Sequence, residues 1–381
     1  MTFWPPHLYR DAGGRKNVPP EIIESALQDA FQVQRQHLLP PVLTLRHLSE
    51  MAGCSYRSLR RIVERTHLRP YRFFQVKKRS TGTRLICVPT GPLMQVQKWI
   101  NRFVLQSVPS HPCSMAFARG QSIVDCARRH CGCQWLIKLD VRRFFESISE
   151  RQVFQVFVGL GYRPLIAFEM ARLSTRVPKK RPRPDERKRW SNGTAAQEKY
   201  SLEDYRSADV GHLPQGAPTS PILSNLCVHG LDENLAALAH ENRLVYTRYA
   251  DDMVFSTTSP FSRDKCMYIA RTVSEQMKVF GLRTNTTKTS IVPPGARKVV
   301  LGLLVDRDHP RLQQTFRKQM ELHMYHLTRH GPLPHAEKRD FDSVFRLKLF
   351  LEGKISYASS VEPEFGESLW HQFNAVEWPF G

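Results

Sequence analysis

Acidic residues are scarce in this chain of 381 residues, and it has no long apolar run. Lys and Arg number 56 against 35 Asp and Glu, which gives a formal net charge of +21. Such an excess favours a polyanionic partner such as nucleic acid. The longest apolar run, residues 299–305, is far shorter than the ~18 residues of a membrane-spanning helix. Residues 1–6 carry neither the basic leader nor the apolar segment of a secretion signal, so we expect a cytoplasmic protein without membrane contact.

Cysteines are also few, and their spacing predicts no disulfide framework. Most of the eight are scattered along the chain, as in proteins of reducing compartments. Only Cys126, Cys131 and Cys133 cluster, with His130 among them. A zinc site typically has a C-x2-C pair and a second Cys or His pair at a matching distance, and neither occurs here. We therefore interpret this cluster as small buried side chains that lead into an apolar strand over 134–140.

The length predicts two or three compact units, at ~150 residues each. Residues 1–70 are expected to be a helical extension. Apolar residues recur at helical spacing over 43–52 and again over 59–63, and Ser55 between them is a candidate N-cap. The pair resembles a helix-turn-helix, which reads DNA. Two short helices packed on a neighbouring domain give the same pattern, and we prefer that interpretation.

From residue 71 the apolar period becomes that of strands. Segments 73–78 and 84–89 flank a turn and predict a basic β-hairpin. A helix over 93–104 follows, and 135–140 is a short apolar strand that ends in Asp140. Helical spacing returns after residue 311. This order of elements predicts a mixed α+β fold.

Residues 175–211 predict an inserted loop. The segment is rich in proline and basic residues, among them Lys179, Lys180, Arg181 and Arg183, and it has few aliphatic side chains. A solvated loop is the common interpretation of such a segment, and contact with a nucleic-acid backbone is the second.

The sharpest chemical pattern is the tetrapeptide Tyr249-Ala250-Asp251-Asp252 between two runs of alternating apolar and β-branched residues. It predicts a β-hairpin that carries two carboxylates in its turn. Two strands side by side would bring Asp140 close to Asp251. Hard oxygen ligands of this kind suit Mg²⁺, which recruits substrate phosphates to complete its coordination. A pair of such ions would activate an attacking hydroxyl and neutralise a leaving pyrophosphate.

Several further blocks, in the same order, resemble those of reverse transcriptases. Segment 77–89 resembles the fingers hairpin, 139–148 the first catalytic block, 213–221 the Leu-Pro-Gln-Gly block, 281–289 the lysine-bearing block and 300–303 the primer-grip strand. The resemblance spans residues 70–305 and implies a right-hand polymerase of fingers, palm and short helical thumb. The implied division is a helical N-terminal extension over 1–70, fingers and palm over 71–305 with the insert 175–211, and a helical thumb or C-terminal RNA-binding region over 306–381.

The resemblance also implies residue roles. Two Mg²⁺ ions, with Mn²⁺ as a possible substitute, would be bound by Asp140, Asp251, Asp252 and the backbone carbonyl of Val141. Phe145 would lie under the sugar of the incoming dNTP and exclude a 2′-hydroxyl. Further nucleotide contacts are implied for Lys77, Lys78, Arg84, Gln215 and Lys288, the last as a candidate proton donor to pyrophosphate. Nucleic-acid contacts are expected at Gly302, Arg317, Lys318 and the basic residues of the insert, Lys179, Lys180, Arg181 and Arg183. A core position for Phe145 and plain surface charges for Lys77, Lys78 and Lys288 are the alternatives.

Within the family, the chain looks most like bacterial retron reverse transcriptases, whose Asn-Ala-x-x-His signature compares with Asn225-Leu226-Cys227-Val228-His229 here. The resemblance implies a cognate structured non-coding RNA as template, priming from an internal guanosine 2′-hydroxyl, a branched RNA–DNA product and a toxin or effector partner in antiphage defence. His229 is either part of that signature or a core histidine. The alternatives are another bacterial lineage (group II intron-like, diversity-generating or abortive-infection) and an inactive nucleic-acid-binding scaffold.

Overall fold

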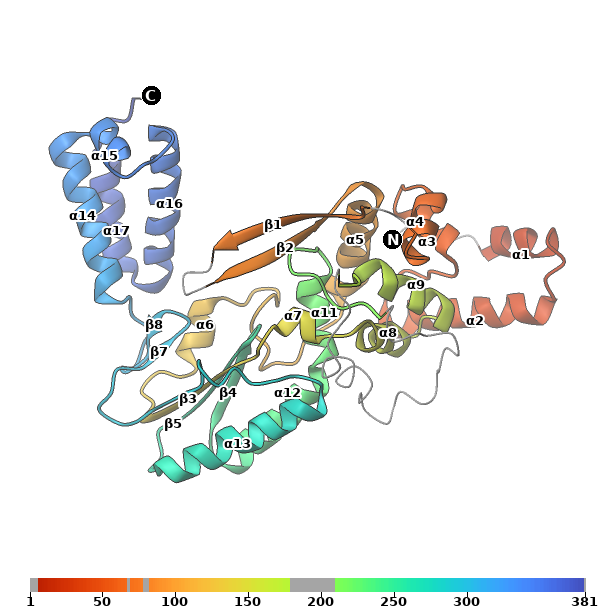
Figure 1. Cartoon of the computed structure of the whole chain (residues 1–381), viewed down its shortest axis with the longest axis horizontal. Coiled ribbons are helices and arrows are strands. Elements are labelled where there is room, and N and C mark those ends of the chain that lie inside the picture. The colour runs from red at the N-terminus through yellow and green to blue at the C-terminus, as the bar shows by residue number, and fades with distance from the viewer. Residues whose placement is uncertain (1–5, 67–68, 78–81, 179–209, 380–381) are drawn as a thin grey trace.

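A four-stranded antiparallel sheet lies at the centre of the computed structural model, which describes residues 6–66, 69–77, 82–178 and 210–379 (Figure 1). Its strands are β4 (Val245–Tyr249), β5 (Asp252–Thr257), β3 (Trp135–Asp140) and β6 (Ser290–Val292), in that order. Both faces of β3 are covered, because Ile137 and Leu139 belong to one apolar core and Leu136 to another. This explains why β3 is a nearly continuous apolar run in the sequence.

The first core joins the sheet to helices of the palm and the fingers. These are α5 (Gly91–Phe103), η1 (Leu105–Ser107), α7 (Phe144–Ser147), α8 (Glu150–Gly159), α9 (Pro164–Ser174), α11 (Ser220–Cys227), α12 (His229–Glu241) and α13 (Arg263–Val279). The predicted fingers hairpin is confirmed as β1 (Tyr71–Lys77) and β2 (Thr83–Pro89), which pair antiparallel with Lys77 opposite Thr83. It extends as a long ribbon toward the C-terminal helices (Figure 1).

The predicted helical extension is also confirmed. It consists of α1 (Pro6–Gly14), α2 (Pro20–His37), α3 (Leu45–Met51) and α4 (Tyr56–Val63). Ser55 is the N-cap of α4, since its hydroxyl accepts a hydrogen bond from the backbone N–H of Ser58. Leu48 and Leu59 belong to the same core as the palm helices, so α3 and α4 are helices packed on a neighbouring domain, as preferred above.

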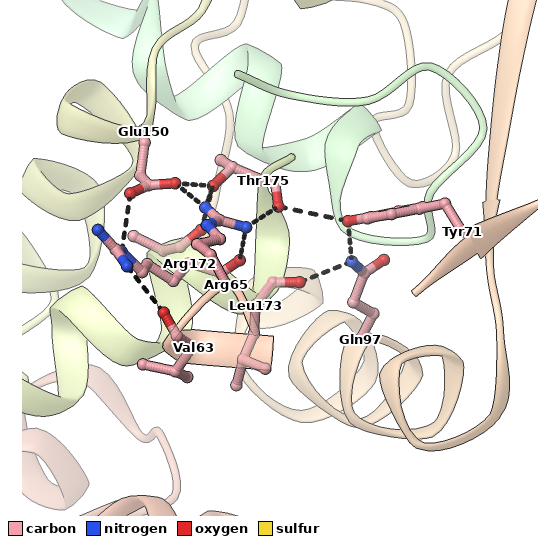
Figure 2. Close-up of polar contacts among 9 residues, drawn as sticks. Val63, Arg65, Tyr71, Gln97, Glu150, Arg172, Leu173 and Thr175 are labelled. Carbon is pink, nitrogen blue, oxygen red and sulfur yellow. Dashed lines mark hydrogen bonds and ion pairs between the residues drawn. The ribbon is translucent and has the colours of Figure 1, made fainter. Parts of the chain in front are cut away.

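A buried polar network joins this extension to the palm (Figure 2). Glu150 on α8 has no exposed surface and pairs with Arg65, which follows α4, and with Arg172 on α9. Arg65 also donates to the carbonyl oxygen of Thr175 at 3.0 Å, and Arg172 to that of Val63 at 2.8 Å. The network lies beside the insert: Arg176 and His212 exchange backbone hydrogen bonds of 3.0 Å. Residues 179–209 lie outside the described ranges.

The C-terminal region is helical, as expected, with α14 (Gln314–His330), α15 (Pro332–Lys338), α16 (Val344–Val361) and α17 (Pro363–Asn374). Its core continues onto α6 (Ile123–Arg128) and onto the palm face that carries Leu136 and Val254. No helix among the described residues is long and apolar enough to span a membrane.

The expectation of one strand over 300–303 is wrong. The segment is a hairpin of β7 (Val299–Val300) and β8 (Leu303–Leu304), with Leu301 and Gly302 in its turn. Both turn residues have positive φ, 48° and 89°. A two-residue turn of this kind matches the right-handed twist of the flanking strands, and its second position suits glycine.

Candidate active site

The pairing of β3 with β5 brings the predicted acids together. Asp140 at the end of β3 lies directly opposite Asp252 at the start of β5. The backbone N–H of Val141 donates to the carbonyl oxygen of Asp251 at 2.9 Å, which ties the next residue to the same turn. Directly opposed residues have Cβ atoms about 5 Å apart. The three aspartates, although distant in sequence, therefore lie at one edge of the sheet.

The turn that carries Asp251 is held from beneath by a buried arginine. Ala250 has φ +55°, and its carbonyl oxygen accepts a hydrogen bond of 3.2 Å from Arg248. Arg248 has no exposed surface and binds both carboxylate oxygens of Asp232, at 2.8 and 2.5 Å. It also donates to Asn225 Oδ1 at 3.1 Å. Sequence reasoning missed this pair, and the only signal for it is a charged residue inside an apolar strand.

Burial raises the proton affinity of Asp251 and Asp252. Burial, followed by the charges of Asp251 and Asp140, raises the pKa of Asp252 to about 6. Burial is also the largest cause that raises the pKa of Asp251. A cation placed among these carboxylates would relieve their repulsion, and hard oxygen donors suit Mg²⁺ or Mn²⁺.

Lys288 supplies one such cationic charge. Its Nζ lies 2.6 Å from Asp140 Oδ2, while Asn285 Nδ2 donates to Oδ1 at 2.8 Å. The hydrogen bond to Asp140 raises the pKa of Lys288. Both oxygens of Asp140 thus have partners, and among the described residues no set of three His, Cys, Asp or Glu side chains is arranged to bind one metal ion. Lys288 therefore lies at the acids, as predicted, and Asn285 is a neighbour whose role sequence reasoning missed.

The Leu-Pro-Gln-Gly turn packs against the fingers hairpin. The carbonyl oxygen of Gln215 accepts a hydrogen bond of 2.7 Å from the N–H of Cys87 on β2. Gly216 has φ +104°, and a Cβ there would lie 2.7 Å from Ile86 Cγ2, so only glycine fits. The close approach brings the predicted nucleotide contact Gln215 to the base of the hairpin.

Other predicted nucleotide residues lie around this junction. The exposed Arg84 is close enough to Asp251 for its charge to oppose the rise of that carboxyl's pKa. Lys77 is exposed at the end of β1, and Lys78 lies outside the described residues. Phe145 on α7 is partly buried and packs against the first apolar core, and its contact with the sugar stays a prediction.

The predicted nucleic-acid residues lie in the β7–β8 turn, on α14 and in the insert. Gly302 is exposed in the β7–β8 turn, and Lys318 is exposed on α14. Arg317 instead binds Glu362 at 2.5 Å and lies over the ring of Phe365 at 4.3 Å, so it joins α14 to α17. The four basic insert residues, Lys179, Lys180, Arg181 and Arg183, lie outside the part of the chain that the structure describes.

The structure also shows the surroundings of two histidines that the sequence singled out, His229 and His130. His229 begins α12 with a 41% exposed side chain and lies 3.5 Å from Glu233, so the core interpretation is wrong. His130 is fully buried, and its ring nitrogens bind the hydroxyls of Ser256 and Thr247 at 2.6 and 2.7 Å. Since both nitrogens have partners, His130 joins α6 to the sheet.

Sequence comparison relates this geometry to known proteins. The family described as reverse transcriptase (RNA-dependent DNA polymerase) matches residues 76–303. The retron Ec86 reverse transcriptase of Escherichia coli is 28% identical over 76% of this chain and 79% of its own length. The retron Mx162 reverse transcriptase of Myxococcus xanthus is 27% identical over 93% of this chain and 72% of its own length. Among solved structures, telomerase from Candida tropicalis matches with a TM-score of 0.39 at 14% identity, over 64% of this chain and 55% of that chain.

Proposed function

The chain belongs to the reverse transcriptase (RNA-dependent DNA polymerase) family, and on that premise we propose that it copies part of a cognate structured RNA into DNA in the manner of a retron. It is an RNA-directed DNA polymerase. The observation that carries the proposal is the register of β3 against β5, which sets Asp140 opposite Asp252 and beside the turn of Asp251.

The chemistry assigned to these residues is nucleotidyl transfer. Divalent ions, which the family uses, would lower the pKa of the attacking hydroxyl and neutralise the leaving pyrophosphate. Asp140, Asp251, Asp252 and the carbonyl of Val141 would hold two Mg²⁺ or Mn²⁺ ions. Lys288 Nζ lies 2.6 Å from Asp140 Oδ2 and would donate a proton to pyrophosphate.

The nucleotide site is proposed between the fingers and the palm. Arg84 and Lys77, with Lys78 beside them in sequence, would bind the triphosphate, whose charge requires fixed cations. Gln215, held against β2 through its carbonyl, would contact the sugar and the template. Phe145 would lie under the sugar. Gly302 in the β7–β8 turn would contact the primer, and Lys318 the duplex.

The retron-specific part of the proposal is supported by the curated relatives and by the net charge of +21. We propose a structured non-coding RNA partner, priming from an internal guanosine 2′-hydroxyl and a branched RNA–DNA product. Structured RNA is recognised mainly through shape, phosphates and 2′-hydroxyls, which a basic surface can contact. A toxin or effector partner in antiphage defence and a cytoplasmic location complete the proposal.

The catalytic assignment is tested with the double variant Asp251→Asn, Asp252→Asn. We expect primer extension with Mg²⁺ and dNTPs to fall by at least about a thousandfold, because the charges that bind the ions are lost. RNA binding, measured by filter retention, is expected to stay within about twofold, since binding depends on distant phosphate contacts. Extension at the wild-type rate would refute a polymerase site at this turn.

The retron assignment is tested on nucleic acid that co-purifies with the protein from its host. Sequencing with and without a debranching enzyme should reveal DNA joined to RNA through a 2′-linkage at one guanosine. Linear complementary DNA alone would instead favour another reverse transcriptase lineage, and RNA without DNA would favour an inactive scaffold.

A further inference from the structure

Phe117 combines three features that the catalytic assignments do not explain. Among the described residues with positive φ it is the only aromatic one, at +62°. Its side chain is 44% exposed, although it follows three buried residues, Ser114, Met115 and Ala116. Its ring lies 6.4 Å from that of Phe145, with an angle of 46° between the ring planes.

The backbone segment that leads into Phe117 is held in place by buried hydrogen bonds. The N–H of Met115 donates to the carbonyl oxygen of Arg248 at 2.8 Å, and the N–H of Arg248 donates to that of Cys113 at 2.7 Å. Arg248 Nη2 also donates to the hydroxyl of Ser114 at 2.9 Å. The segment before Phe117 is therefore fastened to β4, the strand that runs directly into the catalytic turn.

A second support comes from α11. The side-chain amide of Asn225, which is fully buried, donates to the carbonyl oxygen of Ala116 at 2.7 Å. The same residue accepts from Arg248 through its Oδ1. The backbone on the N-terminal side of Phe117 is thus fixed relative to Ala250 by a continuous set of buried contacts, Ala116–Asn225–Arg248–Ala250.

A bulky residue in a disfavoured backbone conformation persists only when its surroundings determine it, and such residues cluster at ligand sites. Here the conformation keeps an apolar ring exposed, which a purely structural role would not require. The tilt between Phe117 and Phe145 makes an aromatic corner rather than a closed stack. A corner of this kind suits the apolar face of a deoxyribose and the edge of a base.

We propose that Phe117 is a second aromatic contact of the incoming deoxynucleoside triphosphate, beside Phe145. This inference rests on the proposed function. The buried Arg248 and Asn225 hold the backbone segment that leads into Phe117, so the position of the ring is set relative to the catalytic turn.

The test is single-nucleotide incorporation by the full-length protein on a preformed primer–template with Mg²⁺. Phe117→Ala should raise the KM for dNTP about tenfold, the size expected for the loss of one aromatic stacking contact, with kcat within about twofold. Phe117→Tyr should keep the wild-type KM, because the ring is retained. Phe103→Ala is the matched control, since Phe103 is also 44% exposed but packs on Trp99 of α5.

Phe117→Gly separates the ring from the backbone. Glycine adopts positive φ without strain, so this variant should fold at least as stably as Phe117→Ala yet show the same rise in KM. A wild-type KM in Phe117→Gly, with a raised KM in Phe117→Ala only, would attribute the effect to the backbone and overturn the proposal.

Two other outcomes would also overturn it. An unchanged KM in Phe117→Ala, with active wild type, removes the ring from the nucleotide site while leaving the polymerase assignment intact. Weaker primer–template affinity with an unchanged dNTP KM assigns the ring to the template instead. If the wild-type protein incorporates no nucleotide, the proposed function fails, and this inference fails with it.

Discussion

Asp140 is bound on both carboxylate oxygens while it faces another acid. Lys288 and Asn285 hold its two oxygens, and Asp252 lies across the strand pair. Lys288 thus provides the positive charge that the crowded carboxylates require. The same contact fixes the loop after α13 to the end of β3, together with a backbone hydrogen bond of 2.7 Å from Asn285 to the carbonyl oxygen of Asp140. One lysine serves both the electrostatics and the geometry of the site.

At the residue scale, the proposed contact of Phe145 with the sugar predicts that this ring selects deoxyribonucleotides. Removing its ring opens room for a 2′-hydroxyl, so Phe145→Ala should raise the ratio of ribonucleotide to deoxyribonucleotide incorporation roughly tenfold or more. The ratio is measured by competition between ATP and dATP on one primer–template. Phe103→Ala, which removes an exposed ring that packs on Trp99, should leave the ratio unchanged. The same ratio in both variants would remove Phe145 from the sugar site.

The three aspartates could be predicted from sequence because each lies in a short local pattern, a strand end or a hairpin turn. Arg248 could not be predicted in the same way. Its partners Asp232 and Ser114 lie 16 and 134 residues away along the chain, so no local period relates them. Phe117 was missed because its exposure and positive φ are consequences of those tertiary contacts.

At the scale of elements, the N-terminal helices are part of the polymerase core. Arg65→Met would remove the ion pair between Arg65 and the buried Glu150 (Figure 2). It would also remove three hydrogen bonds, one to Arg172 and two to Thr175. Breaking a buried ion pair by removing one partner costs about 3 kcal/mol or more. We expect a clear loss of stability in urea-induced unfolding followed by tryptophan fluorescence.

The matched control is Arg61→Met, on the exposed side of α4 and only four residues before Arg65. It should change the unfolding free energy by less than about 0.5 kcal/mol, as surface substitutions do. Equal effects of the two variants would mean that the network in Figure 2 does not join α4 to the palm energetically.

The thumb contains a pH-sensitive contact between elements. His323 on α14 and His335 on α15 are buried, and Nδ1 of the first lies 2.9 Å from Nε2 of the second. Burial lowers the pKa of both to about 4. The charged and titratable groups near this pair on α14, α15 and α16 are all basic, and their charges lower the two pKa values further. They are His326, His330, Lys338, Arg339 and Lys354.

The sign of the pH effect follows from that lowering. Below a pH of about 6.5, His323 and His335 become protonated in the unfolded chain. In the folded protein they stay neutral until the pH approaches about 4. The contribution of this pair to stability should therefore be constant above about pH 6.5 and fall as the pH drops toward 4. Thermal unfolding at a series of pH values measures this. His323→Gln with His335→Gln should make this fall less steep, whereas His371→Gln, at an exposed position of α17, should leave it unchanged. A wild-type slope in the double variant would contradict the assignment.

The elements themselves were largely predictable, because the strands of the palm and the fingers hairpin have a clear alternating period. The β7–β8 hairpin was predicted as one strand for a physical reason. Its turn consists of Leu301 and Gly302, and an apolar residue in a left-handed conformation gives no turn signal. Leu301 packs against the thumb core, which explains why an apolar side chain is retained there.

At the scale of the whole molecule, the palm sheet separates two apolar cores. Ile137 and Leu139 of β3 face the core shared with α13, while Leu136 faces the core shared with the thumb. Because side chains alternate along a strand, Asp140 shares the face of Leu136. The catalytic face is therefore the thumb side of the sheet, and α13 covers the opposite side.

The net charge of +21 gives the last prediction, which concerns RNA affinity. The insert leaves and rejoins the fold where Arg176 pairs with His212, and Arg176 lies 5.7 Å from the ring of Phe73 on the fingers hairpin. The proposal is that the basic residues of the insert bind RNA phosphates. Each phosphate contact contributes about 0.7 to the slope of log affinity against log salt for single strands. Replacing the four basic insert residues by alanine should thus make the slope less steep by up to about 3.

The control for this prediction is a second set of four alanine substitutions, at cations on the side of the sheet that faces away from the thumb. Helix α13 exposes four such residues: Arg263, Lys265, Arg271 and Lys278. Both variants lose the same formal charge, so an effect of net charge alone would lower both slopes equally. Only local phosphate contacts would lower the slope of the insert variant more. Titrations of labelled RNA between about 50 and 200 mM salt measure the two slopes, and equal slopes would refute an RNA contact by the insert.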